Sequence, residues 1–149
     1  MNEKIIATNR KAYHEYFILE KYEAGIELFG SEVKSLREGS ANIKEGYVLL
    51  REGVAILIGV RISPYSHTGF QGHEPSRERR LLLNRREINK LTKKTSEKGL
   101  TIIPLKMYFK GGWAKVEIGL AKGKKHFDKK DSIKKRDINR DTEREMRKR

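Results

Sequence analysis

The feature that most constrains the fold is the uneven distribution of apolar residues along the 149-residue chain. Residues 121–149 contain five apolar side chains, while 13 basic and 6 acidic residues fill most of the remainder. Such a segment cannot bury enough apolar surface to form a core. The sequence therefore predicts one folded domain over residues 1–120, followed by a basic C-terminal tail over residues 121–149.

Short strand-like segments separated by glycine-containing turns predict a mainly β domain. Residues 16–28 are expected to form two strands or one bent strand, with Gly25 as the bulge or turn point. Two hairpins are predicted, one from residues 47–51 and 55–62, the other from residues 100–109 and 113–120 around Gly111 and Gly112. Several short strands with tight turns favour a small closed β-barrel.

Helical patterns are few, so the helices are expected to flank the strands. Residues 31–38 predict a short helix capped by Ser31, and residues 77–98 predict one long, basic, amphipathic helix. Residues 63–76, with two prolines and two glycines, predict a surface loop.

The net charge of +14 indicates a polyanionic partner. Basic side chains crowd the predicted long helix and the end of the barrel, and they would neutralise phosphates at two places. No pattern of a helix-turn-helix or zinc finger is present, and a small barrel with aromatics suits RNA better than the DNA major groove. The basic residues concerned are Arg77, Arg79, Arg80, Arg85, Arg86, Lys90, Lys93, Lys94, Lys122, Lys124 and Lys125.

Several other function classes find little support in the sequence. The absence of cysteine excludes disulfides and thiolate chemistry, and the four histidines lack metal-ligand spacing, so we expect no metal and no cofactor. The longest apolar run has seven residues, against about 20 for a membrane span, and the first residues do not resemble a secretory leader. We therefore expect a cytoplasmic protein without a membrane partner.

One catalytic hypothesis remains open at this point. His14 beside Glu15 could act as the acid–base pair of a small metal-independent ribonuclease. If this segment is a strand, however, adjacent side chains point to opposite faces. Binding is therefore the favoured interpretation. The residues alone also allow an OB-type ribosomal or ribosome-assembly protein.

Several ordered motifs carry a resemblance to a known family. They include His-Glu-Tyr-Phe-Ile at residues 14–18, Glu-Ala-Gly-Ile at 23–26, Gly-Ser-Glu-Val-Lys-Ser-Leu-Arg at 30–37, and Ala-Lys-Gly-Lys-Lys-His-Phe-Asp-Lys at 121–129. Over nearly its whole length the chain resembles the SsrA-binding protein (SmpB) family.

The resemblance implies a bacterial, non-enzymatic adaptor with an OB-fold-like barrel. Such an adaptor binds the tRNA-like domain of transfer-messenger RNA and delivers it to stalled ribosomes for trans-translation. We expect the free protein to be a monomer. The resemblance assigns RNA contact to Asn9, Glu23 and Leu82, with Arg10, His14, Arg79 and Asn84 as supporting residues. Glu23 would accept hydrogen bonds from base amino groups or anchor a nearby arginine.

The resemblance also implies a role for the tail, which is disordered when free and helical on the ribosome. There it would occupy the empty mRNA path near the decoding region of the small subunit and its 16S rRNA. Lys130 stands where the family has arginine, which removes a bidentate donor but keeps the charge. The tail residues assigned to ribosome binding are Phe127, Asp128, Lys129, Lys130, Ile133, Lys134 and Arg136.

Overall fold

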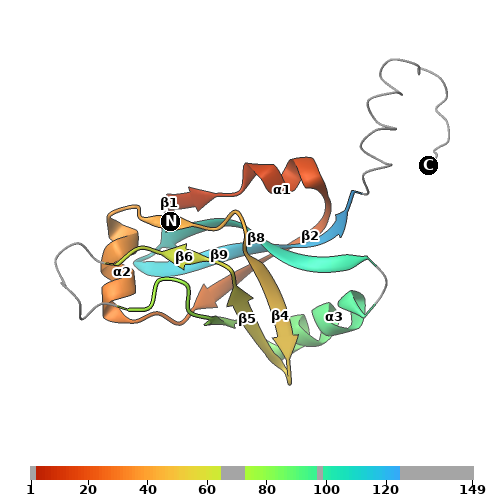
Figure 1. Ribbon diagram of the computed structural model, residues 1–149. Coiled ribbons are helices and arrows are strands. Elements are labelled where there is room, and N and C mark those ends of the chain that lie inside the picture. Colours follow the sequence, from red (N-terminus) through yellow and green to blue (C-terminus); the bar gives the residue numbers. More distant parts are fainter. Residues whose placement is uncertain (1–2, 65–72, 97–98, 125–149) are drawn as a thin grey trace, which may run out of the picture.

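The computed structural model describes residues 3–64, 73–96 and 99–124. Figure 1 shows a curved sheet of strands with three helices at its periphery. The strands are β1 (Glu3–Thr8), β2 (Tyr16–Ile26), β3 (Ala41–Asn42), β4 (Tyr47–Arg51), β5 (Val54–Ile58), β6 (Arg61–Ile62), β7 (Arg79–Leu82), β8 (Leu100–Lys110) and β9 (Trp113–Gly123). The helices are α1 (Arg10–Glu15), α2 (Gly30–Arg37) and α3 (Arg85–Thr95). The expected mainly β fold with flanking helices is confirmed.

The main sheet is antiparallel, and its strands pair in the order β1-β8-β4-β5-β7-β2-β9. Strand β8 pairs with β9 as well as with β1 and β4. The hairpin of β8 and β9 is confirmed, and its turn residues Gly111 and Gly112 have φ values of 59° and 85°. Glycine adopts such angles without a steric penalty, which explains why the pair marks this turn.

The other predicted hairpin is shorter than expected. Strands β4 and β5 pair around Glu52 and Gly53, both with positive φ, but β5 ends at Ile58. Gly59 then has a φ of 81°, and a Cβ there would lie 2.6 Å from the carbonyl oxygen of Glu45. The chain therefore turns, and β6 pairs with β3 in a separate two-stranded sheet.

Strand β2 is one continuous strand whose bulge lies between Ile18 and Glu20, not at Gly25. The bulge changes which face its side chains take. Before it, Ile18 packs on the cluster beneath α1, and after it, Ala24 and Ile26 enter the main core. The prediction that Gly25 is the bulge was wrong.

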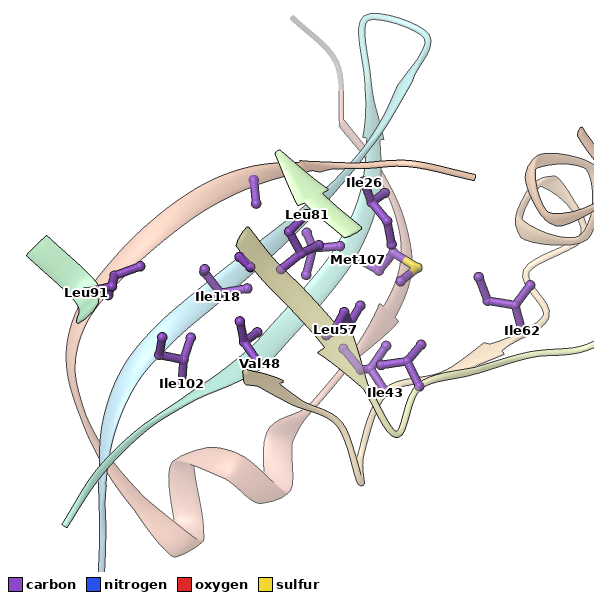
Figure 2. Packing of buried hydrophobic residues seen from close by; sticks show 14 of the residues in the cluster. Ile26, Ile43, Val48, Leu57, Ile62, Leu81, Leu91, Ile102, Met107 and Ile118 are labelled. Atoms are coloured by element: carbon purple, nitrogen blue, oxygen red, sulfur yellow. The ribbon is translucent and has the colours of Figure 1, made fainter. Parts of the chain in front are cut away.

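The main core lies between the strands and is closed at one end by Leu91 of α3 (Figure 2). Its members alternate along β8 and β9, as in Met107 and Val116, which are opposite each other and fully buried. A second cluster forms where Ala12 of α1 covers Leu105 of β8 and Ala121 of β9. Because Ala121 is fully buried and β9 reaches Gly123, the folded part extends beyond the predicted boundary at residue 120.

Only the second part of the helix predicted over residues 77–98 forms, as α3, and its predicted start was wrong. The first part of this range is strand β7, in which buried Arg79 and Leu81 alternate with exposed Arg80 and Leu82. Helix α3 begins only after Asn84, whose side chain accepts a hydrogen bond from the Glu87 backbone N–H at 2.8 Å. Glu87 accepts one in return from the Asn84 backbone N–H, which completes a capping box.

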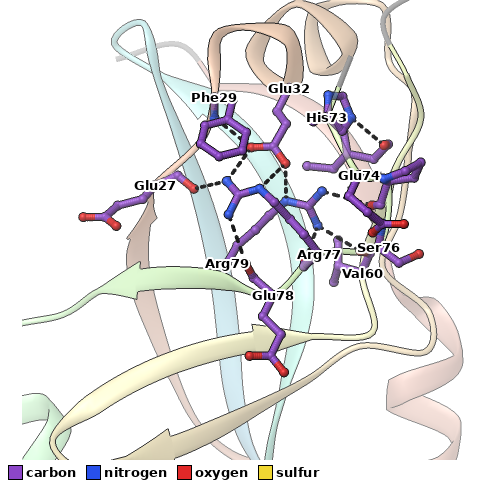
Figure 3. A network of polar contacts seen from close by, with 12 residues as sticks. Glu27, Phe29, Glu32, Val60, His73, Glu74, Ser76, Arg77, Glu78 and Arg79 are labelled. Atoms are coloured by element: carbon purple, nitrogen blue, oxygen red, sulfur yellow. Dashed lines mark hydrogen bonds and ion pairs between the residues drawn. The ribbon is translucent and has the colours of Figure 1, made fainter. Parts of the chain in front are cut away.

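Helix α2 was predicted to be capped by Ser31, but it is not. Instead, Glu32 accepts a hydrogen bond at the start of the helix. Its carboxylate accepts a hydrogen bond from the Phe29 backbone N–H at 2.7 Å. The same carboxylate binds Arg77 at 2.7 Å and Arg79 at 2.8 Å, as Figure 3 shows. Burial alone would raise the pKa of Glu32, but Arg77, the Phe29 N–H and Arg79 outweigh it and hold the pKa below its ordinary value.

The predicted loop over residues 63–76 is not wholly on the surface. His73 is buried and contacts the Ser31 hydroxyl through Nδ1 and the Ile62 carbonyl oxygen through Nε2, each at 2.8 Å. The loop end is thereby attached to α2 and β6.

Candidate nucleic-acid interface

Strands β2, β9 and β8 share one surface that faces away from the main core. Core residues such as Ala24 of β2, Val116 of β9 and Met107 of β8 lie opposite one another in the register. Because side chains alternate along a strand, their sequence neighbours point outward. We call this surface the outer face; its residues are Lys21, Glu23, Gly25, Lys106, Tyr108, Lys110, Lys115 and Glu117.

Glu23 lies at the centre of the outer face and is held there by two side chains of β8. Its Oε2 accepts hydrogen bonds from the Tyr108 hydroxyl at 2.6 Å and from the Lys110 ammonium at 3.3 Å. Among the described residues, nothing donates to Oε1. The Tyr108 hydroxyl, and after it Lys110, hold the pKa of Glu23 below its ordinary value. The carboxylate is thus ionised near neutral pH, with one oxygen positioned and the other open.

Tyr108 forms the floor beneath Glu23. It is 3% exposed, lies under the Lys106 ammonium at 5.0 Å from its ring centroid, and buries its ring against the sheet. Burial and the adjacent Glu23 raise the pKa of Tyr108, so its hydroxyl stays protonated and keeps donating. Among the described residues Glu23 thus holds a tyrosine and a lysine, not the arginine that the anchoring alternative predicted, and its role as an acceptor from a base amino group stays a prediction.

The outer face carries more cations than anions. Lys115 of β9 is opposite Tyr108, and Lys21 of β2 reaches toward Tyr13 of α1, 5.4 Å from the ring centroid. The second acid, Glu117, lies directly opposite Glu23 across the β2–β9 pair. Lys106 also pairs with Glu3 of β1 at 3.2 Å, so four lysines stand against three carboxylates. This small excess of cations favours phosphate while keeping a defined acceptor.

Leu82 joins the outer face through Gly25. The two residues are opposite each other in the β2–β7 pair, and Gly25 is in turn opposite Lys115. Leu82 is 47% exposed, so it is a surface strand residue and not the core-helix leucine that its sequence context would favour. The structure thus brings Glu23 and Leu82 onto one surface although they are far apart in the sequence.

Asn9 is buried elsewhere. Its backbone N–H donates to the Leu105 carbonyl oxygen and its Nδ2 donates to the Pro104 carbonyl oxygen, at 2.9 and 3.0 Å. With 4% of its surface exposed, the side chain holds the start of α1 on β8. Its Oδ1 is also buried and has no hydrogen-bond partner among the described residues. Asn9 thus has a positioning role in the folded domain, and its contact with RNA stays a prediction.

Arg79 also has a structural role instead of a surface one. Its side chain is fully buried, and its donors bind Glu32 and the carbonyl oxygens of Val60, Arg77 and Pro75. The guanidinium therefore lies in the interior and not on the outer face, and RNA contact by Arg79 stays a prediction. Asn84 is exposed, yet its side chain is engaged as the cap of α3.

Arg10 and His14 are exposed on α1, beside the outer face. The segment is a helix, so the strand argument against a His14–Glu15 pair was wrong in its premise. Successive helical residues still diverge, by about 100°. Glu15 instead pairs with Lys11 at 3.8 Å.

Of the basic residues predicted to bind phosphate at the end of β9, only Lys122 and Lys124 are among the described residues. Lys122 is exposed on β9, and Lys124 lies over the Phe17 ring at 4.9 Å from its centroid. On α3, Lys90 and Lys94 pair with Glu20, so part of the helix charge is neutralised internally. Outside the described residues lie Lys125, Phe127, Asp128, Lys129, Lys130, Ile133, Lys134 and Arg136.

Tyr108, Lys110 and Lys115 were not predicted from the sequence as neighbours of Glu23. The signal was available in the confident β8–β9 hairpin, because its period-2 alternation fixes which residues face outward. The sequence does not predict that β2 pairs with β9, so it could not place Glu23 beside the β8–β9 hairpin.

Two further observations concern the described residues. They include no group of three or more His, Asp or Glu side chains arranged to hold a metal ion. None of their helices is long and apolar enough to cross a membrane.

The fold and outer face define a small antiparallel β domain with a cationic open surface around one fixed carboxylate. Comparison with known proteins identifies its family. The model of the SmpB protein family matches residues 6–148. The chain belongs to the SmpB family.

Individual relatives are similar over almost their full length. The SsrA-binding protein of Solidesulfovibrio magneticus is 56% identical over 97% of this chain and 94% of its own length. The SsrA-binding protein of a Sulfurihydrogenibium species is 55% identical over 96% and 94%. A chain in a solved structure described as "tmRNA-SmpB: a journey to the center of the bacterial ribosome" is 44% identical, with a TM-score of 0.71, covering 85% of this chain and 93% of that one.

Proposed function

We propose that this protein is an RNA-binding adaptor that binds the tRNA-like domain of transfer-messenger RNA and delivers it to stalled ribosomes for trans-translation. The observation that carries the proposal is the carboxylate of Glu23, with Oε2 fixed by Tyr108 and Lys110 and Oε1 open on a cationic face. Family membership and the names of the relatives support it.

The chemistry divides between phosphate binding and base recognition. The lysines of the outer face would contact phosphates and release counterions, which makes affinity fall steeply with salt. An ionised carboxylate only accepts hydrogen bonds, so Glu23 would take them from a base amino group, as guanine and cytosine offer. Glu23 thus adds selectivity to a face whose affinity comes from charge.

The adaptor is proposed to act by binding alone, as a cytoplasmic monomer before it meets the ribosome. The pairing of β8 with both β4 and β9 supports an OB-like closed barrel, because the chain of pairings from β8 through β4, β5, β7, β2 and β9 returns to β8. Of the predicted tail over residues 121–149, the part that follows β9 is proposed to engage the decoding region and 16S rRNA, becoming helical there. Its charge and low apolar content support folding upon binding.

Replacing Glu23 with alanine is expected to weaken binding of the tRNA-like domain by about tenfold at physiological salt, because a hydrogen bond to a charged group is lost. The matched control is Glu117→Ala, which removes the same charge from the position directly opposite. That change should leave affinity equal or raise it, since it removes repulsion of phosphate. Fluorescence anisotropy of labelled RNA measures both.

The pair of variants separates recognition from bulk charge. If both alanine variants bind more tightly than the parent chain, Glu23 only repels RNA and is not a recognition residue. Circular dichroism of Glu23→Ala is expected to match that of the parent chain, because the carboxylate is partly exposed and lies outside the core.

A further inference from the structure

Trp113 is the most exposed large apolar side chain in the described part of the chain, at 74%. It is the first residue of β9 and lies opposite Lys110 at the end of the hairpin. Hydrophobic packing does not explain this position, because most of the indole surface remains in water. An exposed aromatic ring next to cations on an open sheet is typical of a surface for unpaired bases.

A groove runs beside Trp113 where β2 and β9 separate. Their pairing ends at Gly25 and Lys115, and beyond it the chain of β2 turns away toward α2. The resulting groove has a volume of about 530 Å³, and Trp113, Lys115 and Leu82 are among its lining residues. Gly25 also lines it, and a Cβ added there would lie 3.4 Å from the Cβ of Leu82. The missing side chain therefore keeps the groove open.

We propose that this groove binds one unpaired base of the RNA, stacked on the Trp113 indole and packed against Leu82. This inference rests on the proposed function and adds a second recognition point to Glu23. It also gives Leu82 a chemical role, because a strand leucine that is half exposed beside an aromatic ring offers an apolar wall to a planar base.

The charges at the groove fit a nucleotide. The base itself is uncharged, while the phosphate attached to it would lie toward Lys115, which lines the groove. The acid that lines the groove, Glu27, is on the segment leading to α2, so the acid and the lysine come from different elements. A paired base would present its edge and backbone, leaving the indole without a stacking partner.

The chain contains a single tryptophan, so its fluorescence reports directly on this site. The full chain is titrated with labelled tRNA-like domain of transfer-messenger RNA while RNA anisotropy and tryptophan emission are both recorded. We expect quenching that follows the binding curve. A fully paired RNA hairpin stem of equal length should bind more weakly and leave the emission nearly unchanged.

Variants test the same site without fluorescence. Trp113→Ala should weaken binding of the tRNA-like domain by about tenfold, and Trp113→Phe should recover most of the loss because a ring remains. Gly25→Val should also weaken binding by filling the groove; the change suits a strand, and Gly25 does not have a positive φ. Leu49→Ala, on β4 and equally an exposed apolar residue, is the control and should bind like the parent chain.

The outcomes distinguish this inference from the proposed function. Tight RNA binding with unchanged emission and full affinity of Trp113→Ala would overturn the base site and leave the proposed function standing; the exposed indole would then serve a different partner. Equal quenching by the paired stem would show contact with the backbone instead of a base, which also overturns it. If the tRNA-like domain does not bind at all, the proposed function is contradicted, and the base site that rests on it is contradicted too.

Discussion

Replacing Glu32 with alanine is expected to lower the free energy of unfolding by about 3–5 kcal/mol, measured by urea denaturation followed by circular dichroism. Glu32 is fully buried and is the partner of Arg77 and of the fully buried Arg79. Removing the carboxylate leaves a guanidinium charge in the interior without its counter-ion, and the first turn of α2 loses its acceptor for the Phe29 N–H.

A double variant separates charge from packing. Glu32→Met combined with Arg79→Met removes the fully buried pair together and should destabilise less than Glu32→Ala alone, because only the partly exposed Arg77 then lacks its counter-ion. A loss below about 1 kcal/mol for Glu32→Ala would contradict the assignment of this network as the anchor of α2 on β7.

The pH dependence gives an independent measure of the same contact. The folded pKa of Glu32 is lowered, so its contribution to stability is complete above the unfolded value of roughly 4.3 and is lost as pH falls through the folded pKa. Stability of the parent chain should therefore fall with acidification more than that of Glu32→Gln, which has no titrating group at this position. Parallel pH curves would contradict the pairing.

Deleting residues 129–149 is expected to abolish tagging on stalled ribosomes while changing affinity for the isolated tRNA-like domain by less than about threefold. The proposed RNA face lies on β2, β9 and β8, and the deletion begins after β9 has ended. Some loss of affinity is expected because the deleted segment is basic and contributes to non-specific attraction. In vitro tagging and RNA anisotropy are measured on the same preparation.

The full-length Glu23→Ala variant is the control for this division. It should lose RNA affinity first, and its tagging should recover when RNA is supplied in excess, whereas the deletion should not be rescued. If the deletion lowers RNA affinity and tagging by the same factor, RNA binding and ribosome binding do not belong to different segments.

The sequence was informative where local chemistry decides the structure. Gly111 and Gly112 predicted the β8–β9 turn because few residues tolerate two successive positive φ values. The capping box of Asn84 and Glu87 is equally local, but it was not predicted, because the helical spacing of leucines across residues 77–98 favoured one longer helix.

Long-range pairing explains what the sequence did not predict. Arg79 reads as a surface cation, and its burial depends on Glu32, 47 residues earlier in the chain. Bulge position in β2 likewise depends on its pairing with β9. Such registers are set by tertiary packing and not by local propensity.

The same reason limits prediction of the site. Glu23 and Leu82 came from family resemblance, and only the strand order shows that they share a surface. Asn9 and Arg79 were assigned by the same resemblance and are buried in the free protein, so they hold other elements in place and their contact with RNA stays a prediction. Tyr108 is a partner of Glu23 because β2 and β8 both pair with β9, and the sequence does not predict this strand order.

The central claim is that the folded domain selects one structured RNA through its outer face. The most direct test is capture of RNA from a bacterial lysate by the tagged full chain at physiological salt, followed by sequencing. An unrelated protein of similar net charge is captured in parallel. We expect transfer-messenger RNA to be the dominant species captured by this chain and not by the charge control. The same RNA population on both proteins would contradict selection by the outer face.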